Sequence, residues 1–147
     1  MEKLNIEFPF CGLTARAAID AGDDTALEEN LKAFLREYGP VKMICHHTGS
    51  TGGLIDCFPQ PREEYPIIAA KHPFYLCEGK QGQLGWNGNH MLLLHETLTE
   101  PLRVGHGIVA QVDPESMDAY MTGCREVWNH CFLYHRLAVI VISLVEE

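Results

Sequence analysis

The sequence lacks an excess of positive charge, a long apolar segment and a secretion signal. Its 147 residues include 20 acidic side chains against 11 Lys and Arg, a formal charge of −9, so the surface repels phosphate backbones and we expect no nucleic-acid partner. The longest apolar run, residues 137–145, is too short to cross a bilayer and fits a buried strand better. The first seven residues have neither the basic start nor the apolar core of a signal peptide. We therefore expect a cytoplasmic protein with no membrane partner.

The common cysteine and metal motifs are also missing. The six Cys contain no C-x-x-C pair, so we expect reduced thiols, most of them in the core, rather than a disulfide framework. Neither H-E-x-x-H nor a carboxylate triad with metal-ligand spacing is present, and we predict no metal and no cofactor. Histidine is nevertheless abundant, with eight in the chain. Because histidines from different strands can converge in a barrel, a metal-dependent enzyme with His ligands stays an alternative hypothesis.

Two segments have the period of amphipathic helices. The first has apolar side chains every three or four residues and ends at a Gly-Pro pair at 39–40. Thr25 and Glu28 can form a capping box at its start. The second begins where Asp113 can act as the N-cap, and it ends near His130. We therefore expect two helices in the whole chain.

The other regular segments have the short apolar–polar alternation of strands. The last of them is apolar on both faces, which indicates a central strand. Residues 59–73 and the glycine-rich residues 79–88 are expected to be irregular. Many short antiparallel strands with two helices predict a mainly β protein, a small closed barrel capped by helices, as one domain over residues 1–147. The expected strands are residues 3–8, 14–20, 41–47, 53–58, 74–77, 90–96, 107–112 and 137–145.

Four segments together carry a resemblance to a known fold family. They are residues 4–19 leading into the first helix, residues 46–59, residues 84–94, and residues 105–110 with the helix and strand that follow. In this order they resemble the cyclophilin-like barrel and, more narrowly, a family of small bacterial proteins of unknown function with that fold. The resemblance implies the architecture, a closed barrel capped by helices.

The resemblance does not carry an activity with it. True cyclophilins are peptidyl-prolyl isomerases whose site depends on an Arg in a Phe-His-Arg strand. The corresponding strand here reads Cys45-His46-His47, so that Arg is absent. A peptide-binding or prolyl-isomerase-like module therefore stays an alternative that rests on fold analogy.

The densest polar cluster is this same Cys45-His46-His47 strand and the turn after it. On a strand Cys45 and His47 share one face and His46 points the other way, so the barrel interior receives one set or the other. The turn contains Ser50 and Thr51 among three glycines, and its donors can form a nest for a carboxylate or phosphate. A flexible hairpin is the structural alternative.

Three other places combine polar side chains with strand ends or glycines. His90 and His95 fall on opposite faces of one strand, and Glu96 at its end can act as a general base beside a histidine. His106 lies between two glycines, which let the backbone pass close to a ligand. Trp86, in the glycine-rich segment, can cover a ligand as a lid. Each place also has a structural alternative: a core strand with polar ends for His90–Glu96, a bend at a barrel corner for His106, and a packing role for Trp86.

We hypothesise a small cytoplasmic enzyme or binding protein that acts on a polar small molecule, an amide or a carboxylate, by His/Glu acid–base chemistry. If it is an enzyme, hydrolysis or isomerisation fits, because neither needs an organic cofactor. Besides the small-molecule ligand, apolar surface on the second helix suits a partner subunit in a homo-oligomer. The catalytic candidates are His47, His106 and Glu96, and the substrate-binding candidates are Cys45, His46, Ser50, Thr51, Trp86 and His95.

Overall fold

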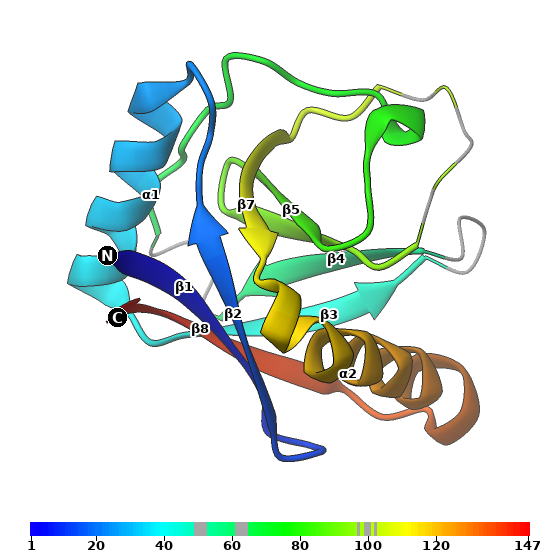
Figure 1. Cartoon of the computed structure of the whole chain (residues 1–147). Helices are drawn as coiled ribbons and strands as arrows, with labels where there is room; N and C mark the ends of the chain where they lie inside the picture. Colours follow the sequence, from blue (N-terminus) through cyan, green and yellow to red (C-terminus); the bar gives the residue numbers. More distant parts are fainter. Residues whose placement is uncertain (49–52, 61–64, 97, 99–100, 102) are drawn as a thin grey trace.

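Eight antiparallel strands close into a barrel in the order β1-β2-β7-β5-β6-β4-β3-β8, with β8 pairing back to β1 (Figure 1). The computed structural model describes residues 1–48, 53–60, 65–96, 98, 101 and 103–147. The predicted mainly β barrel with two helices is confirmed. The strands are β1 Glu2–Phe8, β2 Leu13–Ile19, β3 Val41–His47, β4 Leu54–Pro59, β5 Gln83–Asn87, β6 His90–Leu94, β7 Gly107–Val112 and β8 Ala138–Glu146.

The pleat of the strands divides the buried apolar side chains into two clusters. Inward-facing side chains fill the barrel and pack against the apolar faces of both helices. Outward-facing side chains of β4 and β6, including Leu54, Leu92 and Leu94, form a second cluster with Phe74. Because this part of the wall is buried on both faces, β6 is apolar without alternation.

The first helix, α1, spans Thr25–Tyr38 and buries an apolar stripe against the barrel. Its N-cap is Asp24, whose carboxylate accepts the Leu27 N–H at 3.2 Å and the Lys71 N–H at 2.7 Å. The predicted capping box at Thr25 is therefore wrong, because Thr25 already lies inside the first turn. Asp24 both starts the helix and holds the segment after residue 70 beside it.

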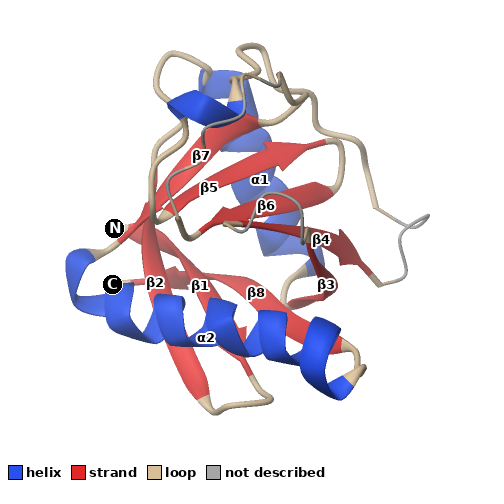
Figure 2. Cartoon of the chain, turned by 90° about the vertical axis from the view of Figure 1, so that its right-hand side faces the viewer, coloured by secondary structure: helices blue, strands red, loops and turns tan. Residues whose placement is uncertain are grey.

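The second helix, α2, spans Met117–Asn129 and lies across the barrel on the side of β2 and β3 (Figure 2). A short 3-10 turn, Pro114–Ser116, precedes it, and a π-helical turn, His130–Tyr134, follows it. Leu133, Tyr134 and Leu137 are exposed there, and a partner subunit on this surface stays a prediction. No helix in the described part of the chain is long and apolar enough to span a membrane.

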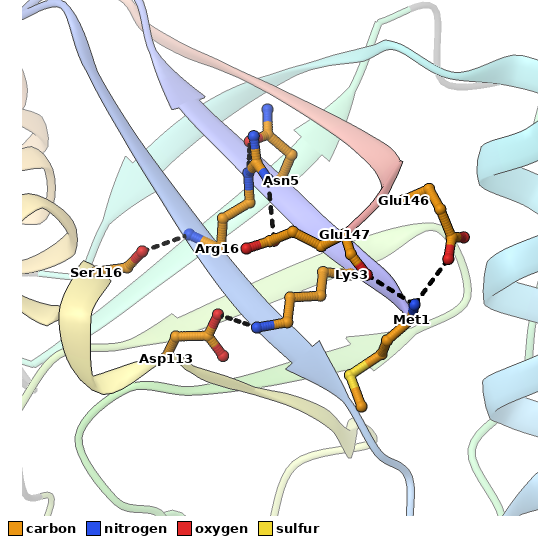
Figure 3. A network of polar contacts seen from close by, with 8 residues as sticks. All are labelled: Met1, Lys3, Asn5, Arg16, Asp113, Ser116, Glu146 and Glu147. Atoms are coloured by element: carbon orange, nitrogen blue, oxygen red, sulfur yellow. Dashed lines mark hydrogen bonds and ion pairs between the residues drawn. The ribbon is translucent and has the colours of Figure 1, made fainter.

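Polar contacts tie the start of α2 to the first two strands (Figure 3). Asp113 occupies the N-cap position of the 3-10 turn before α2, as predicted, but its carboxylate makes no capping hydrogen bond and pairs with Lys3 on β1 at 2.6 Å. The Arg16 N–H of β2 donates to Ser116 at 2.9 Å, and the Arg16 side chain donates to Asn5 at 2.6 Å. These contacts set where the helix begins relative to the barrel.

Two segments differ from the strand prediction. Residues 74–77 do not form a strand; Leu76–Glu78 is a single 3-10 turn, and only Tyr75 makes an isolated bridge, to Arg103. Conversely, β5 was expected to be a loop. The flanking glycines make this segment resemble a loop in sequence, although Leu84 and Trp86 both face inward. β5 is stabilised because the neighbouring strands β6 and β7 pair with it.

α2 lies close to the barrel at Gly123, and this contact can be tested. A methyl group there would lie 2.6 Å from the ring of the fully buried Phe8. We expect Gly123→Ala to lower the free energy of unfolding by about 1–3 kcal/mol through overpacking. This loss opposes the higher helix propensity of alanine, which is about 1 kcal/mol more favourable than glycine inside a helix. Urea denaturation measures the effect, with Thr122→Ala on the exposed face as a control expected to raise the free energy of unfolding by no more than about 0.7 kcal/mol, through helix propensity alone. Unchanged stability in Gly123→Ala would show that α2 does not sit this close to β1.

Candidate functional site

Two histidines from different strands meet at one end of the barrel. β4 separates β3 from β6 in the sheet. His47 closes β3 opposite Ile55, and His95, one residue beyond β6, donates its N–H to the Gly53 carbonyl at 2.9 Å. The two side chains reach across the end of β4, and their Nε2 atoms lie 2.9 Å apart. Of the two faces of β3 that the sequence left open, the inward one carries Cys45 and His47.

Burial makes this histidine pair neutral at physiological pH. His47 is fully buried and His95 is 7% exposed. Loss of solvation lowers the pKa of both rings to about 4, and for His47 the nearby His95 lowers it further while the Glu96 carboxylate opposes the shift. Two neutral imidazoles at this distance share one hydrogen bond, with either ring as donor. Within the described residues, Nδ1 of His47 has no hydrogen-bond partner.

A cavity of about 230 Å³ opens beside the pair. His95 and Glu96 form one side of it, and three side chains of α2 form the other: Met121, Arg125 and Trp128. These three recur at i, i+4 and i+7, so they occupy one stripe of the helix. The cavity therefore brings together a neutral imidazole, a carboxylate, a guanidinium and an indole.

An aromatic wall leads from the surface to the buried pair. Trp128 and Phe132 are 39% and 40% exposed, and their ring centroids are 5.2 Å apart. Phe132 in turn lies 6.0 Å from the ring of His47, which lies 5.1 Å from that of His95. The exposed rings are accessible to a ligand from solvent, and Phe132 lies beside the buried histidine pair.

Larger hollows elsewhere on the molecule have simpler chemistry. One of about 410 Å³ is bordered by the loop before α1, where Asp23 is paired with His72 at 3.0 Å. Another, of about 530 Å³, lies near the chain termini and is lined by no histidine. We place the candidate site in the smaller cavity because there one ring of the buried histidine pair borders open space beside Glu96 and Arg125.

Several residues predicted to bind substrate lie away from this cavity. Cys45 faces the barrel core, where its Sγ is 3.4 Å from that of Cys57. His46 is exposed on the outer face of β3, opposite Asp56. Ser50 and Thr51 lie outside the described residues.

The expected position of Trp86 in a loop over the ligand is wrong. Trp86 lies in β5 and is fully buried. Its ring packs 5.6 Å from that of Phe34 on α1, and its indole N–H donates to the Gly88 carbonyl at 2.9 Å. The indole is thus a core residue that joins the barrel to α1.

His106 lies on the other side of the barrel wall from the pair. Its Cβ is next to Gly85, on the outer face that also carries Leu92 and is covered by Phe74. It is 8% exposed, and burial, with a contribution from nearby His90, lowers its pKa to about 4. Of the three predicted catalytic residues, the structure brings His47 and Glu96 to one site and leaves His106 apart.

Arg125, Trp128 and Phe132 were not among the predicted site residues. Their spacing, with Met121, marks a second stripe of the helix beside the buried one. Which stripe faces a cavity depends on where the helix crosses the barrel, and the helix sequence alone does not contain that information.

Replacing His106 should remove a pH-dependent loss of stability. In the unfolded chain a histidine titrates near its ordinary value of about 6.5, whereas buried His106 stays neutral down to about pH 4. Stability is therefore complete above pH 6.5 and falls as the pH falls toward 4, because the unfolded chain binds the proton first. When the pH is lowered from 8 to 5, the unfolding free energy of both proteins falls. We expect the fall in His106→Leu to be smaller than that in the natural chain by about 1–2 kcal/mol. Urea titrations at both pH values measure this difference, and equal losses in the two proteins would contradict it.

Comparison with known proteins identifies the fold. No protein-family model matches the sequence, and no curated protein matches it. Among solved structures, McbB in complex with tryptophan superimposes with a TM-score of 0.80 at 20% sequence identity. The match covers 95% of this chain and 44% of McbB, so the chain spans less than half the length of that protein. The likeness establishes the barrel architecture.

Proposed function

We propose that the chain binds a small polar molecule, an amide or a carboxylate, in the cavity beside α2 and acts on it by acid–base chemistry. The observation that carries this proposal is the His47–His95 pair, with its Nε2 atoms 2.9 Å apart at the edge of open space. Burying polar rings costs free energy unless their hydrogen bonds are made. Titratable groups with strongly shifted pKa values concentrate at functional sites.

The pair can serve as base or acid according to the position of one proton. When His95 donates its Nε2–H to His47, Nδ1 of His95 is a proton acceptor. When His47 is the donor, Nδ1 of His95 carries a proton and can give it to a ligand. If His95 takes a proton from a ligand at Nδ1 and passes its Nε2 proton to His47, the positive charge resides on His47, where the Glu96 carboxylate stabilises it. A transfer of this kind suits hydrolysis or isomerisation.

The size of the cavity and the fold comparison support a small ligand. A volume of about 230 Å³ lies below the roughly 300–1,000 Å³ of sites for drug-sized molecules. McbB, whose barrel has the same architecture, was solved with tryptophan. Against the metal-dependent alternative, the described residues contain no group of three or more His, Cys, Asp or Glu side chains placed to hold a metal ion.

Binding measurements on matched histidine variants test the proposal. We would titrate the protein by calorimetry with L-tryptophan and a panel of other amino acids, small amides and small carboxylates. For any binder we expect His95→Gln to weaken affinity at least tenfold, because the hydrogen bond to His47 and the ligand contact are both altered. His106→Gln, a buried histidine on the far side of the wall, is the control and should leave affinity unchanged. The proposal fails if no member of the panel binds at millimolar concentration, or if the two variants weaken binding equally.

A further inference from the structure

Arg125 is the cation that borders the cavity beside the histidine pair. The chain has 20 acidic residues against 11 Lys and Arg, yet no described residue forms an ion pair or a hydrogen bond with the Arg125 side chain. Arg125 lines the cavity together with Glu96, and the two side chains form no ion pair. A guanidinium presents a planar fork of donors that matches a carboxylate in two parallel hydrogen bonds.

Aromatic rings border the same cavity. Trp128 lines the cavity one helical turn after Arg125, and Phe132 continues the surface toward His47. Both rings leave about two-fifths of their surface uncovered. Aromatic faces of this kind bind planar groups by offset stacking or edge contacts.

We infer that the ligand of this site is a carboxylate attached to a flat apolar group, with Arg125 binding the carboxylate and Trp128 and Phe132 contacting the flat group. This assignment rests on the function proposed above and names its ligand class. Glu96 repels a carboxylate from its side of the cavity and so favours the orientation toward Arg125. A ligand held in this way has its polar end between the guanidinium and His95, where a proton can be exchanged.

A pair of probes that differ only in charge tests the role of Arg125. Indole-3-propionate carries the carboxylate, and indole-3-propionamide is its neutral counterpart of nearly the same shape. By calorimetry we expect the natural chain to bind the carboxylate at least tenfold more tightly than the amide. Arg125→Gln should abolish that preference, while Arg136→Gln, which removes the same charge from an exposed position outside the cavity, should retain it.

The flat surface has its own test. Trp128→Leu keeps an apolar side chain but removes the ring, so we expect it to weaken indole-3-propionate at least fivefold and 3-cyclohexylpropionate by less. Arg125 and Trp128 are exposed on α2, and thermal melts confirm that each variant folds.

The possible failures are distinguishable. If both indole probes bind equally and Arg125→Gln changes neither, the ligand class is wrong while the proposed site stands. If neither probe binds the natural chain and the broader panel also fails to bind, both the ligand class and the proposed function are overturned.

Discussion

The candidate site depends on one backbone hydrogen bond, from the His95 N–H to the Gly53 carbonyl at 2.9 Å. It extends the β4–β6 ladder one step beyond β6 and holds His95 beside the end of β3. A side chain at residue 53 would obstruct it, since a Cβ there would lie 2.7 Å from the Cβ of Glu96. Glycine at this position lets the chain after β6 lie close to the start of β4. His47 and His95 can then meet across the intervening strand.

The second half of the site comes from a helix that is fixed to the barrel at several points. The Lys3–Asp113 ion pair locates its start, and the close contact of Gly123 with Phe8 sets its distance from the wall. Tyr120, fully buried, donates its hydroxyl to the Leu94 carbonyl at 2.8 Å, directly before His95. This hydrogen bond couples α2 to the strand end that presents the histidine. The cavity is therefore bounded by elements that are joined by direct contacts, which favours a preorganised site.

Local patterns predicted the features that depend on local geometry. Strand alternation places Cys45 and His47 on one face, and the apolar periods locate both helices. The patterns failed where tertiary contacts decide. β5 exists because β6 and β7 pair with it. The Asp113 carboxylate binds Lys3, 110 residues away in sequence, instead of making a capping hydrogen bond. The meeting of His47 with His95 and the separation of His106 follow from strand order around the barrel. Arg125 and Trp128 enter the site only because α2 crosses at that end.

We expect this protein to bind a small molecule between the histidine pair and α2. Crystals soaked with a library of small carboxylates and amides test it most directly. We expect ligand density in the cavity bounded by His95, Arg125 and Trp128, with a carboxylate oriented toward the guanidinium. Density confined to the acidic hollow beside Asp23 and His72, or no density in either place at saturating concentration, would contradict it.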